Sequence, residues 1–102
     1  MDCRPDPVTG RLVCTVELDA PAGQTLTWSD ALVVSSPPVA RPLRSRVPGA
    51  GRPPKRVVLG FVLGAGAGGR IEVLARGVAC SSERRRGCAS LSKKLGFEVE
   101  GR

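Results

Sequence analysis

The chain has 102 residues and no histidine, which excludes the Ser-His-Asp and Cys-His arrangements of nucleophilic enzymes. A chain of this length forms one domain at most, so we expect a single domain over residues 1–102. Hydrophobic residues make up 41% of the chain and only three residues are aromatic. We therefore expect a globular protein with a core of valine, leucine and alanine, no enzymatic activity and no cofactor.

The formal net charge of +7 is unevenly distributed along the chain. Residues 1–30 contain two basic and five acidic residues, whereas residues 31–102 contain fourteen basic and four acidic ones. This asymmetry indicates an anionic partner for the second part, and a solvated basic surface is the simpler alternative. No apolar run approaches the roughly 18 to 20 residues of a membrane span.

The first half of the chain shows alternation of apolar and polar residues that is typical of half-buried strands. Residues 11–18, "RLVCTVEL", follow a turn signal and predict the first strand. Residues 25–28, "TLTW", and 31–36, "ALVVSS", predict two more short strands. Between them, Ser29 and Asp30 either break the run or form a bulge.

Residues 35–55, "SSPPVARPLRSRVPGAGRPPK", form a long connector with six of the nine prolines and five of the sixteen basic residues. This composition is typical of an extended, polyproline-like segment. Its length is at the upper limit for loops of compact domains. The connector therefore either wraps the core, with Val39, Leu43 and Val47 turned inward, or is mobile.

Residues 64–69, "GAGAGG", match the Gly-x-Gly-x-x-Gly pattern of dinucleotide-binding turns. That function needs a helix after the glycines and an acidic residue about 20 positions further on. Here a helix would end at Gly77, and residues 85–91 contain no acidic residue. We therefore favour a β-hairpin with arms at 56–64 and 70–80, and nucleotide binding is the weaker alternative.

The end of the chain reads as a polar loop over residues 80–94, "CSSERRRGCASLSKK", and a last strand over 95–101, "LGFEVEG". The chain thus contains about six short strands separated by proline- and glycine-rich turns. This pattern predicts an all-β fold, either a small antiparallel sandwich or a small barrel.

The four cysteines, Cys3, Cys14, Cys80 and Cys88, lack the short Cys-x2-4-Cys spacing of structural zinc sites. Two disulfides, which imply an oxidising compartment, explain them better than four free thiols. Three connectivities are possible. The local pairing, Cys3–Cys14 and Cys80–Cys88, is attractive because each pair brackets a turn-rich segment.

Cys14, Trp28 and Cys80 form a competing pattern, because their spacing resembles the Cys…Trp…Cys pattern of immunoglobulin domains. Val78 stands where that family has a tyrosine, so the resemblance supports the fold and not membership. The predicted fold is a small antiparallel β-sandwich, immunoglobulin-like or related, with the Pro-rich connector within it.

Arginine side chains are the candidate partner-binding residues. Arg84, Arg85 and Arg86 lie between Cys80 and Cys88, and Arg44 and Arg46 lie on the connector. Guanidinium groups bind phosphate and carboxylate in a bidentate manner, and a closed loop lowers the ordering cost of binding.

We thus expect a non-enzymatic interaction or structural module that binds a protein or another anionic partner. It would act in an extracellular or lumenal compartment as a fragment of a longer precursor, because the first residues contain no signal-peptide hydrophobic region. The alternative is an intracellular basic β-domain that binds nucleic acid. That alternative lacks the aromatic side chains on which β-folds stack bases.

Overall fold

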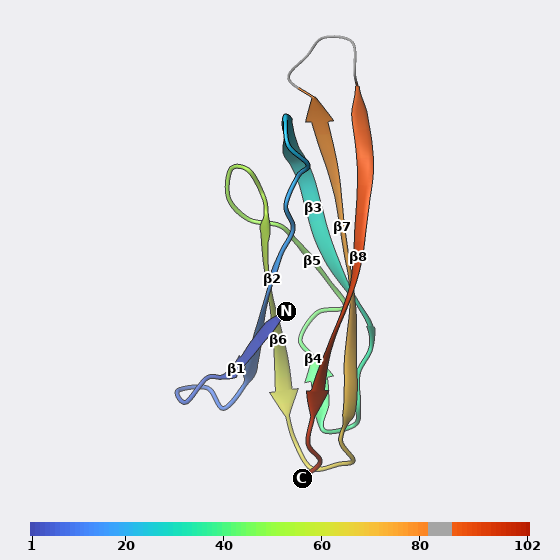
Figure 1. Cartoon of the computed structure of the whole chain (residues 1–102). Coiled ribbons are helices and arrows are strands. Elements are labelled where there is room, and N and C mark those ends of the chain that lie inside the picture. The colour runs from blue at the N-terminus through green and yellow to red at the C-terminus, as the bar shows by residue number, and fades with distance from the viewer. Residues whose placement is uncertain (82–86) are drawn as a thin grey trace.

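The structure is a computed structural model and describes residues 1–81 and 87–102. Two four-stranded antiparallel sheets pack face to face (Figure 1). The strands are β1 (Asp2–Pro5), β2 (Leu12–Glu17), β3 (Gln24–Ser35), β4 (Ala40–Pro42), β5 (Arg46–Pro48), β6 (Arg56–Leu63), β7 (Gly69–Ser81) and β8 (Cys88–Val99). A membrane-spanning helix is absent from the described part of the chain.

The first sheet has the strand order β1-β2-β6-β4 and the second has the order β5-β3-β7-β8. Each central strand turns every second side chain toward the other sheet, because side chains alternate along a strand. The buried side chains include Val16, Leu59, Phe61, Ile71 and Val73. The predicted all-β sandwich with an aliphatic core is therefore confirmed.

The described residues form eight strands rather than six, and Ser29 and Asp30 do not interrupt their strand. The two short strands predicted there are one continuous strand, β3. Its irregularities are bulges in the register with β7, one between Leu26 and Trp28 and one between Val33 and Ser35. Such a bulge inserts one extra residue and leaves the strand able to continue. The additional strands are β1, β4 and β5, which are short and lie at sheet edges.

The predicted hairpin of residues 56–64 and 70–80 is wrong, because its two arms belong to different sheets. Strand β6 pairs with β2 and β4, whereas β7 pairs with β3 and β8. The glycine-rich segment between them carries the chain from one sheet to the other. A Cβ atom on Gly68 would lie 2.5 Å from the Val99 carbonyl oxygen, so glycine allows close backbone approach here.

The predicted polar loop over residues 80–94 is also wrong in its described part. Strand β7 extends to Ser81, and β8 begins at Cys88 and pairs with β7 without a register shift. The serines and lysines of "CASLSKK" suit an edge strand, because much of such a strand faces solvent.

The Pro-rich connector wraps the edges of both sheets. Its strand β4 extends the first sheet beside β6, and its strand β5 extends the second sheet beside β3. Val39 is fully buried and Val47 is half-buried, as expected, but Leu43 is exposed and lies over Gly60 on the outer face of the first sheet. The Ser29 hydroxyl donates to the Pro54 carbonyl and fixes the far end of the connector.

The four cysteines form two disulfides with the local pairing, Cys3–Cys14 and Cys80–Cys88. Each bridge joins directly opposite residues of two adjacent antiparallel strands. The immunoglobulin-like pattern does not hold, because Cys14 and Cys80 have other partners and Trp28 lies outside the core. The two disulfides suggest an oxidising environment.

We expect Phe61→Ala to lower the free energy of unfolding by about 3–5 kcal/mol, because it leaves a cavity at a fully buried position. Val58→Ala is the matched control on the same strand, since Val58 points outward and is 51% exposed. It should cost less than about 1 kcal/mol. Equilibrium denaturation in urea measures both values, and equal losses would contradict the observed facing of β6.

We expect natively purified protein, denatured and alkylated, to gain alkyl groups on all four cysteines only after reduction. The reason is that both disulfides are closed and no described cysteine is free. Intact mass spectrometry gives the number of alkyl groups. Four additions without reduction would show that the disulfides are absent from the native protein.

Candidate functional site

The outer face of the second sheet carries a cluster of four side chains from three strands, which we call the Trp28 cluster. Trp28 and Asp30 lie two residues apart on β3 and therefore share a face. Arg76 on β7 lies directly opposite Asp30, and Arg46 on β5 lies opposite Leu32, the next residue of that face. The sheet register alone thus brings both arginines to the same carboxylate.

Asp30 is fully buried beneath the two arginines that it binds. Arg76 donates from Nε to Oδ1 at 2.9 Å and from Nη2 to Oδ2, a bidentate arrangement. Arg46 donates from Nε to Oδ2 at 2.6 Å. A buried carboxylate is tolerated only with such partners, because burial without them is strongly unfavourable.

The hydrogen bonds from Arg76, together with those from Arg46, lower the pKa of Asp30 below its ordinary value. Burial alone would raise this pKa, so the guanidinium groups outweigh the loss of water. The hydrogen bonds to Asp30 also raise the pKa of Arg76. Asp30 is therefore ionised at neutral pH, and together with its two arginine partners the cluster carries one net positive charge.

Trp28 lies beside the two guanidinium groups, and part of its ring faces solvent. The guanidinium carbon lies 5.6 Å from the ring centroid for Arg76 and 5.9 Å for Arg46. These distances fall within the range of cation–π contacts. Trp28 is 39% exposed, a large value for a tryptophan that contacts two charged side chains.

Both arginines have N–H groups left for another molecule. Among the described residues, neither terminal nitrogen of Arg46 makes a hydrogen bond, and nor does Nη1 of Arg76. The side chains of Arg46 and Arg76 are 50% and 39% exposed. The cluster can therefore accept a carboxylate or phosphate beside an aromatic surface.

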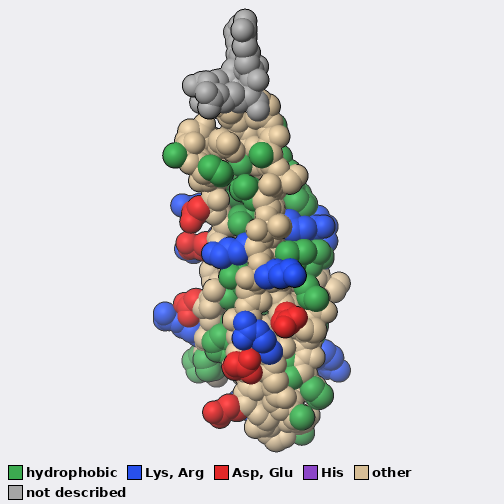
Figure 2. Space-filling model, turned by 45° about the vertical axis from the view of Figure 1, so that its right-hand side comes forward, with side chains coloured by type: hydrophobic (Ala, Val, Ile, Leu, Met, Phe, Trp, Pro, Cys, Tyr) green, Lys and Arg blue, Asp and Glu red, His purple; other side chains and the backbone are tan. Residues whose placement is uncertain are grey.

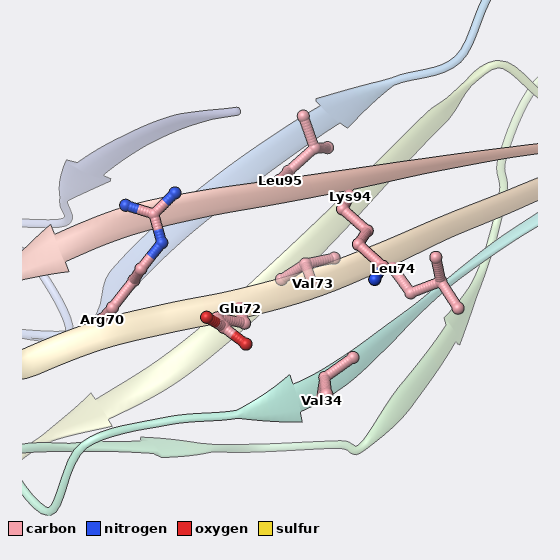
Figure 3. A pocket seen from close by; sticks show the side chains of 7 residues that line it. All are labelled: Val34, Arg70, Glu72, Val73, Leu74, Lys94 and Leu95. Carbon is pink, nitrogen blue, oxygen red and sulfur yellow. The ribbon is translucent and has the colours of Figure 1, made fainter.

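Two grooves lie along the second sheet, and one of them includes two residues of the cluster. A groove of about 300 Å³ lies between Trp28, Arg76 and the serines Ser90 and Ser92 of β8. A second groove, of about 420 Å³, is lined by Val34, Arg70, Glu72, Val73, Leu74, Lys94 and Leu95 (Figure 3). Basic, acidic and hydrophobic side chains are interspersed on the side of the molecule in Figure 2.

The structure separates the partner-binding residues predicted from the sequence. Arg46 belongs to the Trp28 cluster, whereas Arg44 borders a different groove, beside Leu43 and Val58 of the first sheet. Arg84, Arg85 and Arg86 lie outside the described residues. The structure therefore neither supports nor contradicts a role for these three arginines.

Trp28, Asp30 and Arg76 were missed as site residues from the sequence. In the predicted strand "TLTW", regular alternation would put Leu26 and Trp28 on the same face. The bulge between them reverses the alternation, so Leu26 points inward and Trp28 outward. The signal that existed was a charged residue, Asp30, two positions after Trp28 in an apolar strand.

Comparisons with models of protein families, with curated proteins and with solved structures give no match to this chain. The candidate site therefore rests on its own geometry.

We expect Asp30→Asn to lower the free energy of unfolding at pH 7 by about 1–3 kcal/mol, because it removes charged hydrogen bonds at a buried position. Since the pKa of Asp30 is lower in the folded than in the unfolded protein, its contribution is complete above about pH 3.9, the unfolded value. It is lost as the pH falls through the lower, folded value.

Urea denaturation of wild type and variant between pH 7 and pH 2 measures this effect. The difference in stability should be constant at neutral pH and shrink below the unfolded pKa. A difference that is independent of pH would show that the charge of Asp30 does not stabilise the fold.

Proposed function

We propose that this protein is a non-enzymatic interaction module of an extracellular or lumenal compartment and binds an anionic partner through the Trp28 cluster. The observation that carries the proposal is a partly exposed tryptophan held by two arginines, which a fully buried carboxylate keeps in place. Tryptophan and arginine are the residue types that most often dominate interface energies.

Preorganisation supports this proposal over the alternative of a surface that is merely solvated. Ordering long side chains on binding costs free energy. In the cluster these side chains are already ordered in the free protein, so binding avoids much of this cost. Asp30 fixes one edge of each guanidinium group and leaves other N–H groups toward solvent. An acidic segment with an apolar residue beside its carboxylate would match both the arginines and the ring.

The overall charge of +7 adds to this preference, because it steers anionic molecules toward the protein. The sequence-based proposal that Arg84, Arg85 and Arg86 contribute to binding stands separately, because those residues lie outside the described part of the chain. Testing that proposal requires separate substitutions of these three arginines.

Binding of nucleic acid is the second candidate, favoured by the same exposed ring beside two arginines. Base stacking on Trp28 would then be the specific contact. Its distinguishing mark is that the logarithm of the binding constant falls linearly with the logarithm of the salt concentration, with a slope set by the number of phosphate contacts.

Trp28 is the only tryptophan, so its fluorescence reports binding at the cluster directly. The protein is titrated with an acidic peptide of alternating glutamate and leucine, with a heparin oligosaccharide and with single-stranded oligothymidylate. We expect saturable changes with the peptide. Arg46→Gln should weaken binding about fivefold, the loss of about one charge-assisted hydrogen bond.

Arg41→Gln is the matched control, because Arg41 is exposed on β4 at the edge of the other sheet. No fluorescence change with any of the three probes would overturn the proposal, and so would equal losses in the two variants. Binding of the oligothymidylate alone, with a steep salt dependence, would establish the nucleic-acid function instead.

A further inference from the structure

Strand β8 is the longest free edge among the described strands. It ends the strand order of the second sheet and has 12 residues, whereas the other edge strands β1, β4 and β5 have 4, 3 and 3. It runs along β7 over its whole length (Figure 1). A long edge presents unpaired backbone groups to which another strand can add.

One backbone hydrogen bond near the start of β8 determines which of its backbone groups point away from β7. The Ser81 N–H donates to the Gly87 carbonyl at 3.1 Å, so these two residues form a hydrogen-bonded pair. The register continues from there to Gly69 and Val99 without a shift. Bonded and non-bonded pairs alternate, so backbone groups point away from β7 at Cys88, Ser90, Ser92, Lys94, Gly96 and Glu98.

The charges near this edge change sign at Gly96, and Lys94 and Glu98 lie at equal distances from it. Lys93 and Lys94 precede it, and Glu98 and Glu100 follow it. If a second copy runs antiparallel with the two Gly96 residues opposite each other, Lys94 of each copy faces Glu98 of the other. Registers centred on Lys93 or Lys94 would instead place like charges opposite each other, which is destabilising.

The same register also continues the apolar layer between the sheets. Leu95 and Phe97 lie on the core-facing side of β8 and are only half-buried, although they pack against the core. In the pair centred on Gly96, Leu95 of one copy lies opposite Phe97 of the other. Pairing would therefore cover apolar surface that is partly exposed in the single chain.

Lys93 limits which registers are possible. Its position on β8 faces the core side, opposite Ala75, yet the residue is exposed at the edge. Inward-facing charges of this kind oppose indiscriminate edge pairing. Centred on Gly96, the pair places Lys93 opposite Val99 at the margin of the paired segment, so its charge can reach solvent.

The two charged side chains are available for this pairing. Lys94 lies across β7 beside Leu74 (Figure 3) and has no ion pair among the described residues. Glu98 accepts a hydrogen bond from Arg70 at 3.3 Å, in a pair whose side chains are more than half exposed. Such exposed pairs are weak, so reorienting either group costs little.

We infer that two copies of this chain associate through their β8 edges as an antiparallel pair centred on Gly96, with Lys94 facing Glu98 of the second copy. The sheet that contains β8 in one copy then joins the same sheet of the other copy, and the two form one continuous sheet with two-fold symmetry. This surface is distinct from the Trp28 cluster, and the inference does not depend on the proposed function.

Charge reversal at two positions tests the inference. Sedimentation equilibrium without any ligand should show a concentration-dependent dimer for the wild type. Lys94→Glu alone places two carboxylates opposite each other at both cross-pairs, and Glu98→Lys alone places two ammonium groups opposite each other there. Each should weaken dimerisation by at least about tenfold, because two attractive pairs become repulsive.

An equimolar mixture of the two variants provides the decisive measurement. One chain then carries two acidic and the other two basic residues at these positions, so both cross-pairs are attractive and the mixture should dimerise again. Lys55→Glu, a charge change away from β8, is the matched control and should dimerise like the wild type. Circular dichroism with thermal unfolding confirms that each variant is folded.

A wild type that stays monomeric at the highest soluble concentration would overturn the inference. So would dimers that persist in both single variants, or a mixture that does not recover. Because no anionic probe is present, none of these outcomes bears on binding at the Trp28 cluster.

Discussion

The buried carboxylate of Asp30 is the interaction on which the outer face of the second sheet depends. A charge without water must be neutralised and hydrogen-bonded, and here two arginines from the neighbouring strands do both. The carboxylate thereby joins β5, β3 and β7 on one face. It also fixes the position of Trp28, because the same arginines lie beside the indole ring.

The hydrophobic core is small, and two disulfides add to the stability that it provides. Only Phe61 is a large aromatic residue in the fully buried set, and aliphatic side chains fill the remaining space between the sheets. The two disulfides cross-link adjacent strands, β1 with β2 and β7 with β8. Cross-links of this kind stabilise a small domain chiefly by restricting its unfolded chain.

The Trp28 cluster and the β8 edge belong to the same sheet, and this has a consequence for binding. In the dimer that we infer, the second sheet of one chain continues into the second sheet of the other. Their outer faces then form one surface that carries two copies of the cluster. A partner with two acidic segments could then engage both, and the second contact would form at a high effective concentration. The edge would thus raise avidity without changing either cluster.

Alternation, turn residues and cysteine spacing determined much of this protein by themselves. They predicted strands around Leu12–Leu18 and Val57–Leu63 and an all-β sandwich, because these features depend on neighbouring residues. They made the local pairing attractive among three possible connectivities of the cysteines, and the structure has that pairing. They did not predict which strands pair with each other. The arms on either side of Gly64–Gly69 fit a hairpin equally well, and only the tertiary structure shows that β6 and β7 belong to different sheets.

The tertiary structure alone decided the candidate site. One extra residue between Leu26 and Trp28 reverses which side chains of β3 point outward, and no local pattern marks that bulge. Asp30 then meets Arg46 and Arg76, which are 16 and 46 residues away in the chain. Contacts over such separations arise from sheet register, a property of the folded chain that the order of residues along one strand does not contain.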